Sequence, residues 1–259
     1  MAKETKKSSA MPIVIIALVL ILTVGGIAWL YSTSKSPVAA NNGNTNRTTA
    51  NAARTPGVPA NAPAGAAPVY AKGQPTATVT IEEFADFQCP SCSVAHPTMK
   101  DIQAAYAGNK NVRFIFRHLP LSIHDKAYDA AAVVEAAGMQ GADKYWSMMD
   151  QLMSNQQTWA TSANYRELWK GYAEKIGLDV PKWESDASGM GTRGRVDLDI
   201  TRARAIGVSS TPTVYINNKP IPFADVNVPT MRQLIEAELE NTTRTAAPAA
   251  NASATSNSQ

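Results

Sequence analysis

Cysteine and histidine are scarce in this chain. Its 259 residues include two cysteines, Cys89 and Cys92, and three histidines, His96, His118 and His124. Two cysteines cannot build a disulfide framework, and a static bridge across so short a loop would constrain the unfolded chain very little. A tetrahedral zinc site needs about four ligands, and the histidines show no ligand-type spacing. The composition therefore predicts no metal site and favours a redox role for the cysteine pair.

Clustered positive charge is missing from the part of the chain that can fold. Residues 1–75 carry seven basic and one acidic side chain, whereas residues 76–240 carry 16 basic and 20 acidic ones. The formal charge of +3 therefore hides a mildly acidic domain behind a basic N-terminal segment. Because nucleic-acid-binding domains need a basic surface, the sequence predicts no nucleic-acid binding.

Long apolar runs are absent except for one near the N-terminus, at residues 12–30. A helix of about 19–20 residues spans roughly 30 Å, the thickness of a bilayer core. Lysines precede the run, and Trp29 and Tyr31 lie at its outer end, where aromatic rings favour the membrane interface. We expect residues 1–11 in the cytoplasm, residues 12–31 as an uncleaved transmembrane anchor, and the rest of the chain outside the cytoplasm.

The alternative for this segment is a cleaved signal peptide. Its apolar region would be shorter, about 7–15 residues, although Val38-Ala39-Ala40 fits a cleavage site. A buried core helix fits less well, because the run has too little polarity for an amphipathic face. We therefore expect a single-pass protein of the cell membrane, with its folded domain on the extracytoplasmic side, periplasmic or extracellular.

Two segments have almost no large apolar side chains, namely residues 32–75 and 241–259. Such Ala/Asn/Thr/Pro-rich stretches cannot bury enough surface to offset the entropy lost on ordering. We expect residues 32–75 to be a disordered linker and residues 241–259 a disordered tail. Residues 76–240 between them are enough for one domain with its own core.

Hydrophobic periodicity predicts an α/β domain in residues 76–240. Alternating residues predict strands at 77–87, 112–118, 213–216 and, weakly, 219–223. Helical spacing occurs after the cysteines to about residue 107, at 127–139, 142–153, 164–176 and 195–206, and from Pro229 onward. The element order is therefore strand, helix, strand, a block of helices, two strands and a final helix.

Two motifs carry a family resemblance. The stretches EEFADFQCPSC at residues 82–92 and GVSSTPTVYIN at residues 207–217 resemble the DsbA-like thiol-disulfide oxidoreductases. The resemblance covers about residues 77–240 and implies a thioredoxin-like fold with a helical insertion, about residues 120–206, between the second and third strands. In this chain one N-terminal transmembrane helix would precede that fold.

The roles of the two cysteines can also be inferred from their chemistry, without the resemblance. Cys89 starts a predicted helix, where unpaired backbone N–H groups and the helix dipole stabilise an anion. We expect its pKa below the free value of about 8.5 and assign it as the nucleophile. Cys92, one turn further on, would attack the mixed disulfide and release the product. Pro90 and Ser91 tune the pair.

The residue at position 91 leaves the oxidising power open. Relatives with the motif CPHC carry a histidine where this chain has Ser91. A positive imidazolium would stabilise the thiolate, whereas a serine hydroxyl offers only a neutral hydrogen bond. The chemistry of the pair is unaffected by this difference.

Glu83 is the only charged residue on an otherwise apolar face of the first predicted strand. Burial raises a carboxyl pKa, which suits a proton carrier for Cys92. The resemblance implies the same role, because the family has an acidic residue six positions before the first cysteine. If the strand alternation is misassigned, Glu83 is solvated instead. Glu82, on the opposite face, is predicted to be a surface charge.

Thr211 and Pro212 match the family's cis-proline loop, which presents backbone to substrate opposite the active-site helix. From sequence alone a trans turn is the commoner geometry, so the cis bond is an implication of the resemblance. Pro97, eight residues after Cys89, matches the kink proline of many thioredoxin-fold helices and has a structural role.

Other conspicuous residues receive structural interpretations. The three histidines have no partner pattern and are not predicted to be catalytic bases. Arg193, Arg195, Arg202 and Arg204 alternate with aspartates, which is typical of a solvated helix face. Large residues of the helical block are expected in the core, with a minority lining a substrate groove: Trp146, Met148, Met149, Met153 and Trp169.

Three functions fit these residues. The first is a monomeric dithiol oxidase that introduces disulfides into cysteine-containing exported proteins, without a cofactor beyond its own Cys89–Cys92 disulfide. The resemblance implies that a membrane quinone-linked partner regenerates that disulfide. The second is the reverse chemistry, a membrane-tethered reductase or isomerase for surface proteins or cytochrome maturation. The third is a non-catalytic module that holds unfolded chains in the groove around Pro212.

Overall fold

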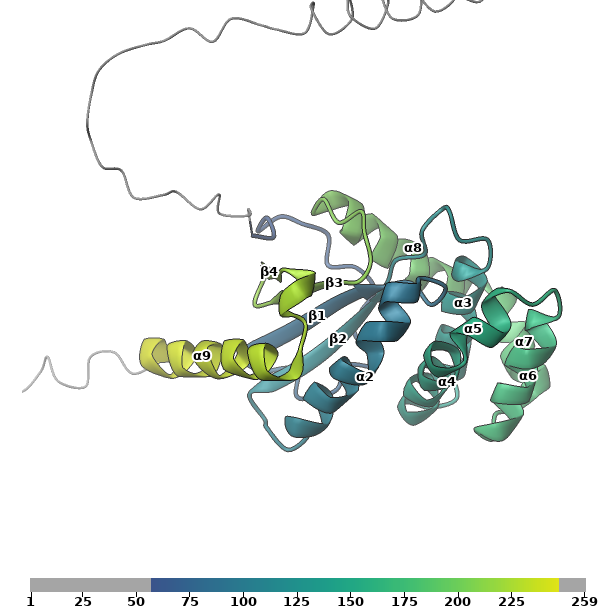
Figure 1. Cartoon of the computed structure of the whole chain (residues 1–259), viewed down its shortest axis with the longest axis horizontal. Helices are drawn as coiled ribbons and strands as arrows, with labels where there is room; N and C mark the ends of the chain where they lie inside the picture. Colours follow the sequence, from purple (N-terminus) through teal and green to yellow (C-terminus); the bar gives the residue numbers. More distant parts are fainter. Residues whose placement is uncertain (1–56, 247–259) are drawn as a thin grey trace, which may run out of the picture. The chain divides into compact units, whose positions relative to one another are not determined.

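The computed structural model describes residues 57–246 of the chain (Figure 1). The predicted anchor at residues 12–31, residues 32–56 of the predicted linker and the tail from residue 247 lie outside this range. Within the described range, no helix is long and apolar enough to cross a bilayer.

A mixed sheet of four strands lies at the centre of the described fold (Figure 1). The strands are β1 (Val79–Ala85), β2 (Val112–His118), β3 (Thr213–Ile216) and β4 (Lys219–Ile221), in the spatial order β2-β1-β3-β4. β1 and β2 are parallel, whereas β3 is antiparallel to β1 and β4 is antiparallel to β3. Asn217 and Asn218 both adopt positive φ, as the tight turn between β3 and β4 requires.

Helices α2 (Pro90–Ala105) and α9 (Val228–Ala246) pack against one face of the sheet. Val79 and Ile81 of β1 meet Met99 and Ile102 of α2 and the apolar residues of α9 in one buried cluster. α2 follows directly after β1, so the alternating strand side chains and the apolar stripe of the helix meet with little intervening chain. α9 continues past residue 241, where the sequence predicts the disordered tail to begin.

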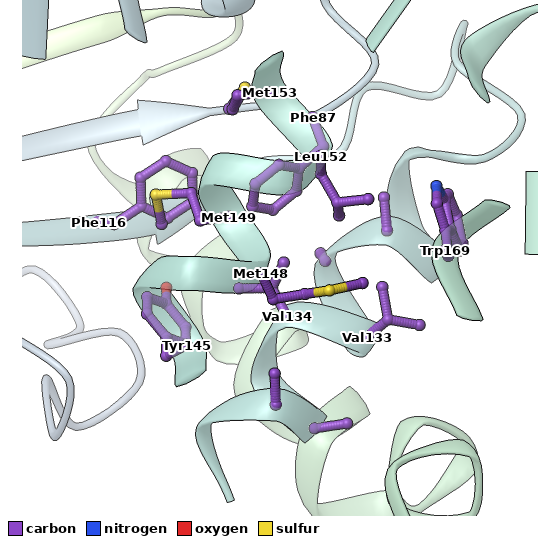
Figure 2. Close-up of a cluster of buried hydrophobic side chains, with 14 of the residues drawn as sticks. Phe87, Phe116, Val133, Val134, Tyr145, Met148, Met149, Leu152, Met153 and Trp169 are labelled. Carbon is purple, nitrogen blue, oxygen red and sulfur yellow. The ribbon is translucent and has the colours of Figure 1, made fainter. Parts of the chain in front are cut away.

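Six helices lie between β2 and β3, where the sequence predicts a helical insertion. They are α3 (Ala127–Gly138), α4 (Ala142–Ser154), α5 (Gln156–Ala160), α6 (Tyr165–Lys175), α7 (Val180–Ser188) and α8 (Met190–Ala205). α3 consists largely of alanine and valine and is buried along most of its length, so the larger side chains of α4 and α6 pack closely around it (Figure 2). Met148, Met149, Met153 and Trp169 are core residues as predicted, whereas Trp146 is half-buried.

The segment at residues 57–75, termed here the N-terminal strap, differs from the predicted linker because it packs against the domain. The carbonyl of Ala66 accepts from Arg117 at 2.6 Å, and its N–H donates to Asp199 at 2.9 Å. Lys72 forms an antiparallel bridge with Phe114 of β2. The composition argument weighed apolar side chains only, whereas backbone polar groups hold the strap in place.

The prediction that Glu82 is a surface charge is wrong. Glu82 is 5% exposed, and its carboxylate accepts hydrogen bonds from Arg117 and Arg202 at 2.7 Å each. The predicted solvated face of α8 is likewise wrong for Arg202 and Asp199, which are buried. Helix α8 and the strap cover the second face of the sheet, so strand alternation does not separate core from solvent here.

Candidate active site

Cys89 is the N-cap residue of α2. β1 ends at Ala85, a short turn follows, and Pro90 occupies the first turn of the helix, a favoured place for proline. Cys89 has an extended backbone, and no side chain caps the helix through a hydrogen bond. Its sulfur therefore lies where unpaired backbone N–H groups and the helix dipole favour a negative charge.

The two cysteines are free thiols in different surroundings. Cys89 is 8% exposed and Cys92 is fully buried, so Cys89 is the more accessible sulfur. A hydrogen bond from Cys92 is the main reason that the pKa of Cys89 falls to about 5, against the opposing effect of burial. The same hydrogen bond and burial raise the pKa of Cys92 above its ordinary range. This asymmetry is what a nucleophile and a resolving thiol require.

The loop before β3 brings Thr211 and Pro212 to Cys89. The Thr211–Pro212 peptide bond is cis, which confirms the geometry implied by the resemblance. The Cys89 thiol donates to the carbonyl oxygen of Thr211 at 3.5 Å. The Thr211 hydroxyl is buried without a hydrogen-bond partner among the described residues, and the Thr211 side chain also lowers the pKa of Cys89.

Pro90 and Ser91 form the exposed part of the cysteine turn. The backbone N–H groups of Ser91 and Cys92 lower the pKa of Cys89. Ser91 thus lowers the pKa of Cys89 through its backbone N–H. Pro97 lies inside α2, in the structural position that the sequence predicts.

Glu83 lies on the face of β1 that α2 covers and is 7% exposed. Its neighbours include Met99 and Gln103 of α2 and the apolar side chains of β2. Burial raises the pKa of Glu83 to about 7, in the direction that its place on the strand predicts. Within residues 57–246, no hydrogen bond links this carboxyl to either cysteine sulfur, so its role as proton carrier stays a prediction.

Asp86 is a site residue that sequence reasoning missed. It is 1% exposed in the turn between β1 and α2. Its carboxylate accepts from the N–H of Gln88 at 2.7 Å, the N–H of Leu121 at 2.8 Å and Nδ1 of His124 at 2.7 Å. Asp86 therefore joins the cysteine turn to the loop after β2. An aspartate between a strand and a cysteine turn was visible in the sequence, but its partners were not.

The three histidines each pair with a carboxylate. His124 contacts Asp86, His118 lies 3.0 Å from Glu135, and His96 lies 2.9 Å from Asp150. These partners come from other elements of the fold and could not be recognised from spacing. Only the His124 pair directly supports the cysteine turn.

Gln156, the first residue of α5, is a second missed residue. It is 4% exposed, and its Nε2 donates to the carbonyl oxygens of Phe87 and Cys89, at 2.7 Å each. Its Oε1 accepts from the Ser93 hydroxyl at 3.1 Å. Gln156 thus connects the helical insertion to both ends of the turn that contains Gln88.

The described fold and the paired cysteines define a thioredoxin-fold protein with a CxxC site. The sequence model of the family described as Thioredoxin matches residues 67–237. The chain belongs to this thioredoxin family, and its fold is that of the DsbA-like thiol-disulfide oxidoreductases.

Two solved structures illustrate the likeness. Oxidised BdbD from Bacillus subtilis is 25% identical with a TM-score of 0.59, and the match covers 69% of this chain and 98% of that one. α-DsbA1 from Wolbachia pipientis has the same fold with a TM-score of 0.58 at 18% identity, over 69% of this chain and 94% of that one.

Curated relatives match over a shorter segment. The Na(+)/H(+) antiporter NhaA 3 of Salinispora tropica is 34% identical over 151 residues, which are 58% of this chain and 22% of the antiporter. The antiporter NhaA 1 of Mycolicibacterium gilvum is 31% identical over 153 residues, which are 58% of this chain and 23% of that protein. The chain thus spans about a fifth of the length of these relatives.

Proposed function

We propose that the chain is a thiol-disulfide oxidoreductase that works as a dithiol oxidase. The observation that carries this proposal is the asymmetry of the cysteines, since the pKa of Cys89 is lowered to about 5 while that of Cys92 is raised. A stabilised thiolate favours the reduced pair, which makes the disulfide a stronger oxidant. Thioredoxin, with a cysteine pKa of about 7, has a potential of about −270 mV, and DsbA, with about 3.5, has about −120 mV.

The reaction transfers two electrons from a client dithiol to the Cys89–Cys92 disulfide. A client thiolate attacks Cys89 Sγ, the Cys89–Cys92 bond breaks, and Cys92 leaves and takes up a proton. The second client thiolate then attacks the client sulfur of the mixed disulfide. Cys89 leaves as a thiolate, which its low pKa favours, and the client keeps the new disulfide.

Glu83 and Thr211 have distinct roles in this scheme. Cys92 needs a proton when it leaves, because its pKa is raised. A carboxyl with a pKa of about 7 can give and regain a proton near neutral pH, directly or through one water. The buried Thr211 hydroxyl, which lacks another partner among the described residues, donates to the Cys89 thiolate once that thiolate forms.

The clients and the location extend the same proposal. A single N-terminal anchor holds a monomeric domain outside the cytoplasm, where cysteine pairs of exported proteins can be oxidised. A membrane quinone-linked partner takes the two electrons and restores the disulfide without another cofactor. The apolar run at residues 12–30 and the family resemblance support this arrangement.

The reduction potential of the Cys89–Cys92 pair tests the function. The protein is equilibrated with glutathione buffers, and the oxidised fraction is measured by thiol labelling, with Cys89→Ser as the control that cannot form the disulfide. A potential nearer −120 mV than −270 mV supports the oxidase. A value near −270 mV indicates a reductase, and a pair that does not exchange with glutathione indicates a binding module.

A further inference from the structure

The side-chain amide of Gln156 is fully engaged at the cysteine turn. Its nitrogen donates to the carbonyls of Phe87 and Cys89, and its oxygen accepts from Ser93. A glutamine amide has two N–H donors and one carbonyl oxygen, so each group has a partner here. The two carbonyls accept only N–H donors, so they set which end of the amide faces the turn, and the Ser93 hydroxyl, which also lies 2.9 Å from the carbonyl of Pro90, meets the other end.

The supporting helix holds this amide in a rigid place. Trp159, one turn further along α5, is fully buried and donates from its indole N–H to the carbonyl of Leu152 at 2.7 Å. Its ring packs edge-on against Trp169 of α6, with 5.2 Å between the ring centroids. A short helix anchored in this way can position a side chain accurately.

The carbonyl of Cys89 is also part of the first turn of α2. It accepts from the N–H of Cys92 at 3.0 Å and from the N–H of Ser93 at 3.3 Å. Carbonyl oxygens carry partial negative charge, which opposes an anion on the neighbouring sulfur. An N–H donor on the carbonyls of Phe87 and Cys89 offsets that charge, and in a site of low dielectric such an effect is strong.

We propose that Gln156 is a positioning residue of the cysteine site, whose amide clamps the carbonyls of Phe87 and Cys89 and thereby stabilises the thiolate of Cys89 in the reduced protein. This role rests on the proposed function, since it concerns the thiol assigned there as the nucleophile. The helical insertion thus helps to set the oxidising strength of a site that lies on the thioredoxin-like part of the fold.

The test replaces Gln156 by methionine, which has a similar length and no N–H donor. The matched control is Gln157→Met, the same change at the exposed neighbouring residue. The thiolate of Cys89 is titrated by ultraviolet absorbance and by the pH dependence of alkylation, and the equilibrium with glutathione is measured. We expect Gln156→Met to raise the pKa of Cys89 and to lower the equilibrium constant for glutathione oxidation about three- to tenfold, the effect of one or two hydrogen bonds.

Two further variants keep the test decisive. Gln156→Leu also removes both N–H donors and should shift both readouts in the same direction, whereas Ser93→Ala, which keeps both donors of Gln156, should shift them less. Wild-type titration and equilibrium in Gln156→Met and Gln156→Leu, with or without a loss of thermal stability, would overturn the positioning role. If the wild-type Cys89 titrates as an ordinary thiol, the proposed function itself fails, whatever the variants do.

Discussion

Glu82 and Glu83 are adjacent in β1, face opposite sides of the sheet and have opposite electrostatic surroundings. They are 5% and 7% exposed, so their burial is nearly equal. Burial alone would raise the pKa of Glu82, but the hydrogen bonds and charges of Arg202 and Arg117 lower it. No cation among residues 57–246 pairs with Glu83, and burial raises the pKa of this carboxyl to about 7. The partners of a buried carboxyl, rather than its depth, decide whether it is charged at neutral pH.

The cysteine turn repeats this contrast with two thiols. Cys89 stands at the helix terminus and receives hydrogen bonds, whereas Cys92 is buried behind it and donates one. A proton held by Cys92 therefore stabilises the negative charge on Cys89. In each pair one group is charged at neutral pH, namely Glu82 or Cys89. The other group, Glu83 or Cys92, holds a proton or exchanges one near neutral pH.

The largest expected effect separates the two thiols. In the reduced protein at pH 6, Cys89 should be alkylated more than a thousandfold faster than Cys92, because Cys89 is mostly ionised and Cys92 is not. Peptide mapping after brief exposure to iodoacetamide measures the ratio. The denatured protein, in which both thiols should react alike, is the control. Equal or preferential labelling of Cys92 in the folded protein would reverse the assignment.

Removing the charge of Glu82 should destabilise the folded protein, because Glu82 is the member of the glutamate pair that is paired with arginines. Glu82→Gln leaves Arg202 buried without a carboxylate and Arg117 paired with Asp199 alone, which should cost about 3–5 kcal/mol of unfolding free energy. Urea unfolding measures the loss. The exposed Glu174→Gln serves as the control and should stay within about 0.5 kcal/mol of wild type. A similarly small change in Glu82→Gln would contradict the ion-pair interpretation.

The stability that Glu83 contributes should fall as pH rises, whereas a carboxyl with a lowered pKa, such as Glu82, contributes stability that is lost as pH falls. The pKa of Glu83 in the folded protein lies above the ordinary value of 4.5, so the folded state keeps a proton that the unfolded chain has lost. The stability linked to Glu83 is full below pH 4.5 and is lost as pH rises to about 7, by up to about 3 kcal/mol.

Glu83→Gln isolates this contribution. The variant should lack the decline between pH 4.5 and 7 and should be more stable than wild type at neutral pH. Unfolding of the oxidised proteins by urea at several pH values measures it, since the disulfide removes the titration of the thiols. If the unfolding free energies of wild type and variant change with pH in parallel, the pKa of Glu83 is not raised in the folded protein.

The smallest expected effect is on turnover. Glu83→Gln should slow dithiol oxidation about a hundredfold near neutral pH, at the lower end of what proton transfer by a positioned group contributes. Initial rates with a reduced peptide across pH 5–8 measure it, and the Cys89 alkylation rate checks that the nucleophile is intact. Wild-type rates across this range would leave Glu83 as an internal polar residue without a role in the reaction.

The element order of the fold was predictable because its signals are local. The alternation of β1 and β2, the helical spacing of the insertion and the cysteine pair at a strand-to-helix junction all appear within short windows of sequence. The placement of Cys89 at the start of α2 depends only on where the strand ends and the helix begins. The cis bond before Pro212 was accessible only through the family resemblance.

The support of the cysteine turn could not be predicted in the same way. Gln156 and His124 reach this turn from distant parts of the chain. Gln156 donates to backbone carbonyls, which have no side-chain signature, and His124 pairs with Asp86, 38 residues away in the sequence. The strap is held through its carbonyls, which every residue has. Polar residues in such long-range contacts look like surface residues in a sequence.

Sequence patterns alone were enough to identify the cysteine turn, the strand carrying Glu83 and the helical insertion, because the chemistry and periodicity of neighbouring residues specify them. Only the tertiary structure decided that Glu82 is a buried partner of Arg117 and Arg202 rather than a surface charge. The physical reason is that charge burial depends on what covers the second face of the sheet. That cover comes from α8 and the strap, which are far apart in the sequence.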